Sequence, residues 1–133
     1  MITVQVAGEP DDGLARSIVE TVTTLTAEHL RKDPKVTAVA VDFVPRRFWY
    51  VAGKSVEQHG VSAFFVTVRI SDGTNTKDEK ARYLAETFAA FDRLLGGIHQ
   101  ESYIHIDDAR ADSYGYGGRS QERRYIEGRP RAE

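Results

Sequence analysis

A chain of 133 residues is long enough for one domain with a single hydrophobic core. Apolar residues make up 41% of it and charged residues 29%, which is the composition of a folded globular chain rather than a disordered one. The net charge of −2 gives no electrostatic case for binding nucleic acid or an anionic membrane, and the lack of cysteine excludes disulfides and thiolate metal sites. Because no segment resembles a signal peptide or a membrane span, we expect a cytoplasmic protein.

The first half of the chain predicts a strand, a helix and a second strand. Residues 2–7 alternate apolar and polar side chains, which is typical of a strand with one buried face. Apolar residues from Leu14 onward, with His29 last, recur at helical spacing until Pro34 prevents the helix from continuing. Residues 36–44 predict the next strand, and the aromatic segment Phe48-Trp-Tyr50 follows it.

The second half repeats this order. Residues 63–70 predict a strand, and Thr76 and Glu79 have the spacing of a capping box that begins a helix. An apolar stripe then runs to Leu95, where two glycines end the helix, and residues 102–107 predict a fourth strand.

The two halves match at an offset of about 64 residues. Ile2-Thr-Val-Gln-Val-Ala7 aligns with Val66-Thr-Val-Arg-Ile-Ser71, and Tyr50 aligns with Tyr114. Each half pairs its strands in parallel through a helical crossover, so we predict an α/β (α+β) fold with a mixed four-stranded sheet and two helices on one face. The other face has mixed polarity, which favours assembly with further copies of the chain.

We therefore predict one domain over residues 1–118, built from the repeats 1–60 and 61–118. Residues 119–133 are rich in arginine and predict an arm or a tail, in which Tyr125 and Ile126 are the only apolar anchors.

Two segments carry a resemblance to a known family. Residues 39–53 and 103–117 resemble the matching strands and glycine-ended turns of the macrophage migration inhibitory factor group. The chain length and the place of His29 resemble the cis-3-chloroacrylic acid dehalogenase group. Together they resemble the tautomerase superfamily, which also includes 4-oxalocrotonate tautomerase, over about residues 1–118.

The resemblance implies a homotrimer whose catalytic group is an N-terminal proline in a pocket between subunits. This chain has Met1 in place of that proline, and the bulky Ile2 after it predicts that Met1 is retained. In one interpretation, the α-amine of Met1 serves as the acid and base, since burial would lower its pKa from about 7.7–8. In the other, the pocket only binds a ligand.

The resemblance also implies further site residues. Tyr103 matches a tyrosine that lines the pocket, and we assign it with Met1 to the catalytic set, although a strand tyrosine also serves packing. His29 matches a substrate-binding histidine, with a structural helix-end histidine as the alternative. His105 points the same way as Tyr103 on a regular strand, and Trp49 belongs to an aromatic cluster able to line the pocket or cover the core.

The dehalogenase group holds a carboxylate with two arginines that this chain lacks in the turn after residue 70. Arg69 and Lys35 are the substitutes we assign to substrate binding, together with Ile70, although such cations are more often solvated. Only Asp112 is available near the place of the acid that activates water, which favours tautomerisation over hydration or dehalogenation.

The leading expectation is a keto–enol isomerase acting on a small 2-oxo acid or enol, without a cofactor or a metal. The four histidines show no metal-ligand spacing, and neither nucleic acid nor membrane is expected as a partner. The alternatives are a non-catalytic binding or scaffold subunit of the same fold and a ferredoxin-like binding domain.

Overall fold

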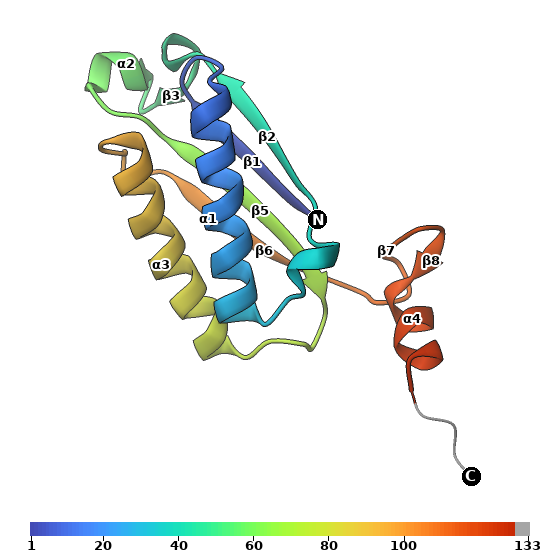
Figure 1. The fold of residues 1–133 in the computed structure, drawn as a ribbon. Helices are drawn as coiled ribbons and strands as arrows, with labels where there is room; N and C mark the ends of the chain where they lie inside the picture. Colours follow the sequence, from blue (N-terminus) through green and yellow to red (C-terminus); the bar gives the residue numbers. More distant parts are fainter. Residues whose placement is uncertain (130–133) are drawn as a thin grey trace.

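A four-stranded sheet forms the centre of the protein, in a computed structural model that describes residues 1–129 (Figure 1). The last four residues of the predicted arm, 130–133, lie outside the described residues. The strand order is β2-β1-β5-β6. The strands are β1 (Ile2–Ala7), β2 (Val39–Val44), β5 (Phe64–Ser71) and β6 (Tyr103–Ala109).

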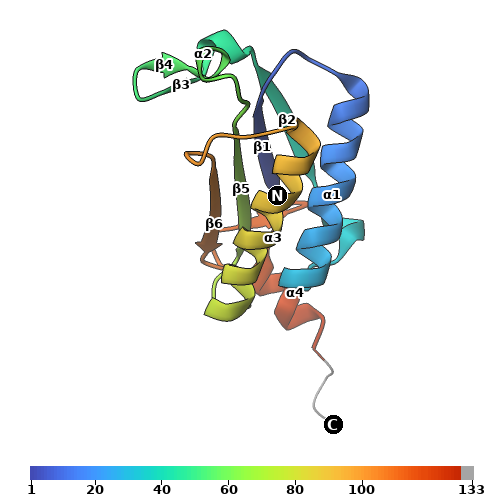
Figure 2. The same cartoon turned by 90° about the vertical axis from the view of Figure 1, so that its left-hand side faces the viewer.

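Two long helices cover one face of this sheet, as the second view shows most clearly (Figure 2). They are α1 (Asp12–Leu30) and α3 (Lys77–Leu95). Strand β1 runs parallel to β2, and β5 runs parallel to β6, whereas the two pairs join through antiparallel pairing of β1 with β5. The predicted mixed sheet with both helices on one face is confirmed.

Local sequence signals explain where the helices begin and end. The Asp11 carboxylate accepts the Leu14 backbone N–H at 2.8 Å, and Thr76 and Glu79 form the predicted capping box. Helix α3 ends at Gly96, whose φ of 70° is the left-handed conformation that glycine adopts without strain. The predicted strand over 36–44 begins only at residue 39, because Pro34–Val36 form a short helical turn η1.

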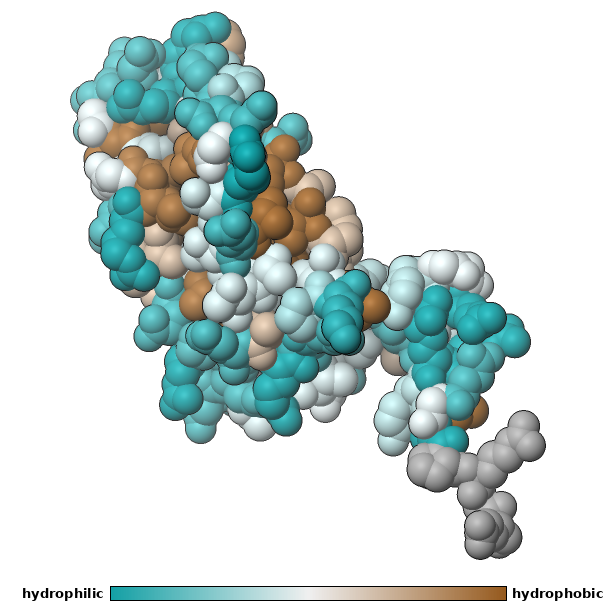
Figure 3. Space-filling view, in the orientation of Figure 1, coloured by the Kyte–Doolittle hydropathy of each residue, from teal (hydrophilic) through white to brown (hydrophobic). Residues whose placement is uncertain are grey.

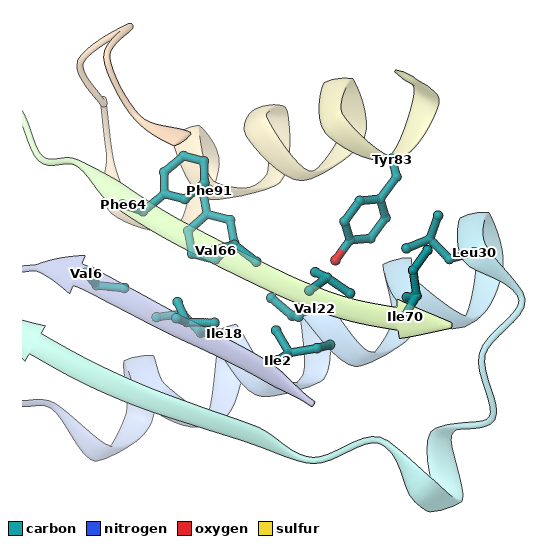
Figure 4. Close-up of a cluster of buried hydrophobic side chains, with 12 residues drawn as sticks. Ile2, Val6, Ile18, Val22, Leu30, Phe64, Val66, Ile70, Tyr83 and Phe91 are labelled. Atoms are coloured by element: carbon teal, nitrogen blue, oxygen red, sulfur yellow. The ribbon is translucent and has the colours of Figure 1, made fainter. Parts of the chain in front are cut away.

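The core lies between the sheet and the helices (Figure 4). The rings of Phe64 on β5 and Phe91 on α3 stack with their centroids 4.2 Å apart. Tyr83 is fully buried, and its hydroxyl lies 2.9 Å from the Thr26 hydroxyl of α1, so the polar atom has a partner. Figure 4 shows this hydroxyl pointing from α3 toward α1.

Each repeat ends in a small hairpin followed by a short helix. The first has the turn η2 (Arg46–Phe48), the hairpin β3 (Tyr50–Val51) with β4 (Lys54–Ser55), and α2 (Val56–His59). The second has the hairpin β7 (Gly115–Tyr116) with β8 (Arg119–Ser120), and α4 (Gln121–Glu127). A serine caps both short helices, Ser55 and Ser120.

The structural match of the two hairpins differs by one residue from the sequence alignment. The Val56 N–H donates to the Trp49 carbonyl at 2.8 Å, and the Gln121 N–H donates to the Tyr114 carbonyl at 2.8 Å. Trp49, rather than Tyr50, is therefore the counterpart of Tyr114 in the first repeat.

Residues 112–127, here called the C-terminal arm, project from the end of β6 beside the N-terminus (Figure 1). Tyr125 and Ile126, the only apolar residues available to anchor it, are well exposed within one chain, at 69% and 59%. Figure 3 shows a mainly hydrophilic arm, whereas apolar side chains gather between the helices and along the sheet edge beside α1. Within residues 1–129, no helix has the length and apolarity to cross a bilayer.

Candidate functional site

A cavity of about 650 Å³ opens where β1 begins and β5 ends. Four segments surround it: the N-terminus, the connection from α1 to β2, the end of β5 with its turn, and the C-terminal arm. It is therefore built from residues at both ends of the chain and from its middle. Its walls are partly apolar, with side chains from Ile2, Val36, Val68 and Ile70.

The backbone of the first two residues is held between two strands at this cavity. The Ile2 N–H donates to the Ala38 carbonyl at 2.8 Å, and the Arg69 N–H donates to the Met1 carbonyl at 3.1 Å. These bonds direct the α-amino group of Met1 into the cavity, where it donates a hydrogen bond to the Tyr114 hydroxyl at 2.6 Å.

This environment changes the acidity of the Met1 amine. Partial burial lowers the pKa of the amine, and the nearby positive charge of Arg69 lowers it further. A larger share of the amine is therefore neutral near pH 7 than at an ordinary N-terminus, so it is able to accept a proton there.

Arg69 lies on β5, on the sheet face that the helices leave uncovered. Its guanidinium is 4.0 Å from the Asp107 carboxylate of β6, and its side chain is 38% exposed. Arg69 lines the cavity, and its charge acts on the Met1 amine, so the residue is placed to attract an incoming carboxylate.

A second cation, Lys32, lines the cavity from the end of α1. Its ammonium donates to the Thr74 hydroxyl at 2.9 Å, and burial, followed by the charge of Arg31, lowers the pKa of Lys32. Sequence reasoning missed this residue, because Arg31 and Lys32 are equivalent as cations at a helix end. The structure separates them: Arg31 adopts the left-handed conformation and binds Glu79 at 2.8 Å, which leaves Lys32 to face the cavity.

Tyr114 is the other residue that sequence reasoning missed. Its hydroxyl receives the Met1 hydrogen bond and lies 3.5 Å from the Arg69 carbonyl. Burial raises the pKa of Tyr114, so the phenol stays protonated at neutral pH. The repeat did not reveal it, since the sequence alignment pairs Tyr114 with Tyr50, and only the structure pairs it with Trp49, a residue assigned to the site.

The structure brings three of the predicted site residues together: Met1, Arg69 and Ile70 all line the cavity. Trp49 and Tyr103 border a separate hollow of about 360 Å³. Tyr103 also lines a third hollow, of about 490 Å³, with His105, and its hydroxyl donates to the Glu101 carboxylate. That bond is the main reason why the pKa of Tyr103 is raised.

Trp49, Tyr103 and His105 thus do not share a cavity with Met1 within one chain, and their roles stay predictions. His29 lies one helical turn beyond Thr26, a residue that lines the cavity, and Lys35 precedes the lining residue Val36. Neither His29 nor Lys35 lines the cavity itself. Their assignments also stay predictions.

No group of three or more histidine, aspartate or glutamate side chains is placed to hold a metal ion anywhere in the described residues. The chemistry that the arrangement supports directly is proton transfer by the Met1 amine and the Tyr114 phenol beside two cations.

Comparison with known proteins agrees with this geometry. Residues 1–59 match the sequence model of the tautomerase enzyme family. No curated protein matches the chain significantly by sequence.

Solved structures match over nearly the whole chain. A wild-type fused 4-OT, described as a symmetric trimer, is 16% identical, with 96% of this chain and 98% of that chain covered and a TM-score of 0.79. Pt0534 inactivated by 2-oxo-3-pentynoate is 14% identical, with 92% and 97% covered and a TM-score of 0.78. FG41 malonate semialdehyde decarboxylase inhibited by 3-bromopropiolate is 15% identical, with 98% and 99% covered and a TM-score of 0.73.

The chain therefore has the fold of a tautomerase, with a cavity at its N-terminus. The resemblance to the tautomerase superfamily that the sequence predicted is confirmed.

Proposed function

We propose that the protein is a tautomerase-type isomerase that interconverts the enol and keto forms of a small 2-oxo acid. The observation that carries the proposal is the α-amino group of Met1, directed into a cavity with a lowered pKa. The role requires that the mature chain begin at Met1 with a free amine. An intact-mass measurement of the purified protein checks this requirement.

The chemistry needs one group that moves a proton between oxygen and carbon. A neutral amine accepts the proton of the enol hydroxyl and, as an ammonium, delivers a proton to the carbon of the double bond. The lowered pKa favours this role because a larger share of the amine starts neutral near pH 7 and the ammonium, once formed, is a stronger proton donor.

Two cations on different walls of the cavity support an anionic substrate. Arg69 lies next to the amine, so a carboxylate bound there would hold the adjoining carbonyl or enol carbon near Met1. Lys32 faces the same space from the end of α1 and suits a second polar or anionic group. The apolar walls suit a short carbon chain.

A homotrimer is part of the proposal. The uncovered sheet face exposes the large apolar side chains of Phe65 and Tyr103, at 37% and 59%, and a solved structure with this fold is described as a trimer. In such an assembly, Trp49, Tyr103 and His105 would reach the cavity of a neighbouring chain rather than that of their own.

The alternative is a binding or scaffold subunit without catalysis. The methionine in place of the proline that the superfamily resemblance implies favours this alternative. A primary amine retains the lone pair that proton transfer needs, however, so the substitution alone does not remove the chemistry.

Ketonisation assays separate the two functions. Phenylenolpyruvate and 2-hydroxymuconate are assayed as substrates with unmodified protein and with protein whose Met1 amine is acetylated. We expect ketonisation by the free protein and its loss after acetylation. A free protein that accelerates neither reaction would contradict the proposed isomerase function and favour the binding function. Placing a proline behind a removable methionine serves as the control for the pocket, because activity gained in that variant shows that the rest of the site is intact.

A further inference from the structure

We propose that the phenol of Tyr114 relays a proton between the substrate oxygen and the Met1 amine. The inference rests on the isomerase function proposed above and adds a second catalytic residue to it. The inference is based on the direct contact of the two groups. The amine nitrogen lies 2.6 Å from the phenol oxygen, and both residues line one cavity.

The contact is suited to proton transfer in either direction. When the amine is charged, it donates to the phenol oxygen, and when it is neutral, its lone pair accepts the phenol proton at the same position. The distance of 2.6 Å is slightly shorter than the roughly 2.7–2.9 Å usual for charge-assisted N–H···O hydrogen bonds. The pair therefore forms a continuous path for a proton.

The arm that carries Tyr114 is folded, with contacts between its own helix and hairpin. The guanidinium of Arg124 lies over the Tyr116 ring, 3.8 Å from its centroid, and donates to the Tyr116 carbonyl at 2.9 Å. The Gln121 N–H holds the Tyr114 carbonyl at 2.8 Å. Hence α4 and the β7–β8 hairpin fix the backbone from which the phenol extends.

Gly115, the next residue, shows how closely this backbone is packed. A Cβ at Gly115 would lie 2.0 Å from the Arg119 carbonyl oxygen across the hairpin, so no other residue fits without moving the chain. At Gly117, a Cβ would lie 2.7 Å from the Arg124 guanidinium, and φ is 62°. Gly115 is thus needed for the hairpin backbone that carries Tyr114, and Gly117 suits the left-handed conformation of the turn.

Each proton that leaves one group in the relay is accepted by another. The enol hydroxyl gives its proton to the Tyr114 oxygen as the Tyr114 hydroxyl proton passes to the neutral Met1 amine. The resulting ammonium gives one proton to the carbon of the double bond, which forms a C–H bond as the carbon–oxygen double bond closes. Tyrosine and amine end in their starting forms, and the product is the ketone.

The charged groups around the pair are compatible with this cycle. Arg69 on β5 disfavours the ammonium, while Asp107 on β6 partly offsets the charge of Arg69. From the far wall, Lys32 and Asp33 face the cavity with opposite charges. The phenol remains a proton donor because burial raises its pKa.

The test is Tyr114→Phe, compared with Tyr125→Phe, which removes an exposed hydroxyl of the same arm outside the cavity. The pKa of the Met1 amine is measured without substrate, from the pH dependence of its carbamylation by cyanate. We expect Tyr114→Phe to lower the amine pKa by about one unit, because the ammonium loses a charge-assisted hydrogen bond. Tyr125→Phe should match the wild type.

The catalytic readout is the ketonisation of phenylenolpyruvate. Tyr114→Phe should reduce kcat by about 100-fold with little change in KM, the loss typical of one proton-transfer group. A kcat equal to that of the wild type would overturn the relay, whatever the amine pKa. A wild type that ketonises no enol would overturn the proposed function, whereas an amine pKa unmoved by Tyr114→Phe counts against Tyr114 alone, so the two failures are distinguishable.

Discussion

Arg69 should affect the Met1 amine and the substrate in two separable ways, which Arg69→Gln exposes. The substitution removes the positive charge that lowers the amine pKa, so that pKa should rise. The same substitution removes the guanidinium that we propose holds the substrate carboxylate, so KM should rise as well.

The magnitude of each effect follows from the surroundings of Arg69. The side chain is 38% exposed and lies 4.0 Å from the Asp107 carboxylate, so its charge is screened as in a surface ion pair. An interaction of about 0.3–1 kcal/mol raises the amine pKa by about 0.2–0.7 unit. A lost charge-assisted hydrogen bond of about 1.5–3 kcal/mol raises KM by about 10- to 150-fold.

Two control variants isolate these effects. Arg69→Lys keeps the positive charge but lacks the planar guanidinium that binds a carboxylate through two N–H donors. The amine pKa should therefore stay near that of the wild type, while KM should still rise. Arg47→Gln removes an exposed arginine that pairs with Glu9 at 3.6 Å, and it should change neither quantity. The assays are cyanate carbamylation for the pKa and steady-state ketonisation for KM. An amine pKa and a KM that are both unmoved by Arg69→Gln would refute the assigned role of Arg69.

Three further predictions concern the core, the arm and the second cation. Phe91→Ala should lower the free energy of unfolding by about 3–5 kcal/mol in urea titrations, because the fully buried ring stacks on Phe64 at 4.2 Å, and a loss below 1 kcal/mol would contradict this packing. Gly115→Ala should reproduce the kcat loss of Tyr114→Phe while leaving the unfolding free energy of the main core nearly unchanged, since its Cβ would lie 2.0 Å from the Arg119 carbonyl oxygen. Lys32→Met should raise KM by about 10-fold for a dicarboxylate enol but less for a monocarboxylate, whereas Lys54→Met on the exposed β3–β4 hairpin should change neither, and an equal effect of the two variants would exclude Lys32 from binding.

Hydrophobic periodicity and chain duplication predicted the sheet and both long helices. Alternation over residues 2–7 marks β1 because Ile2, Val4 and Val6 face the main core, and the capping box at Thr76 marks the start of α3 locally. The η1 turn at Pro34–Val36 was missed, because a short turn adds no periodicity to the pattern.

The site was only partly predictable, for a geometric reason. Met1 directly precedes β1 and Arg69 lies on β5, so their neighbourhood follows from the pairing of these two strands. Tyr114 reaches Met1 through an arm whose direction depends on the β7–β8 hairpin and on the contact of Arg124 with Tyr116. Contacts between residues 113 positions apart leave no pattern in the local sequence.

The pH dependence of kcat/KM for ketonisation, compared with the directly measured pKa of the Met1 amine, tests the central claim most directly. Because the neutral amine is the active form and its pKa is lowered, activity should rise with pH through a value below the usual 7.7–8.0 of an N-terminus. The carbamylation pKa should coincide with that midpoint. A midpoint that differs from the amine pKa, or activity that survives acetylation of Met1, would contradict the account.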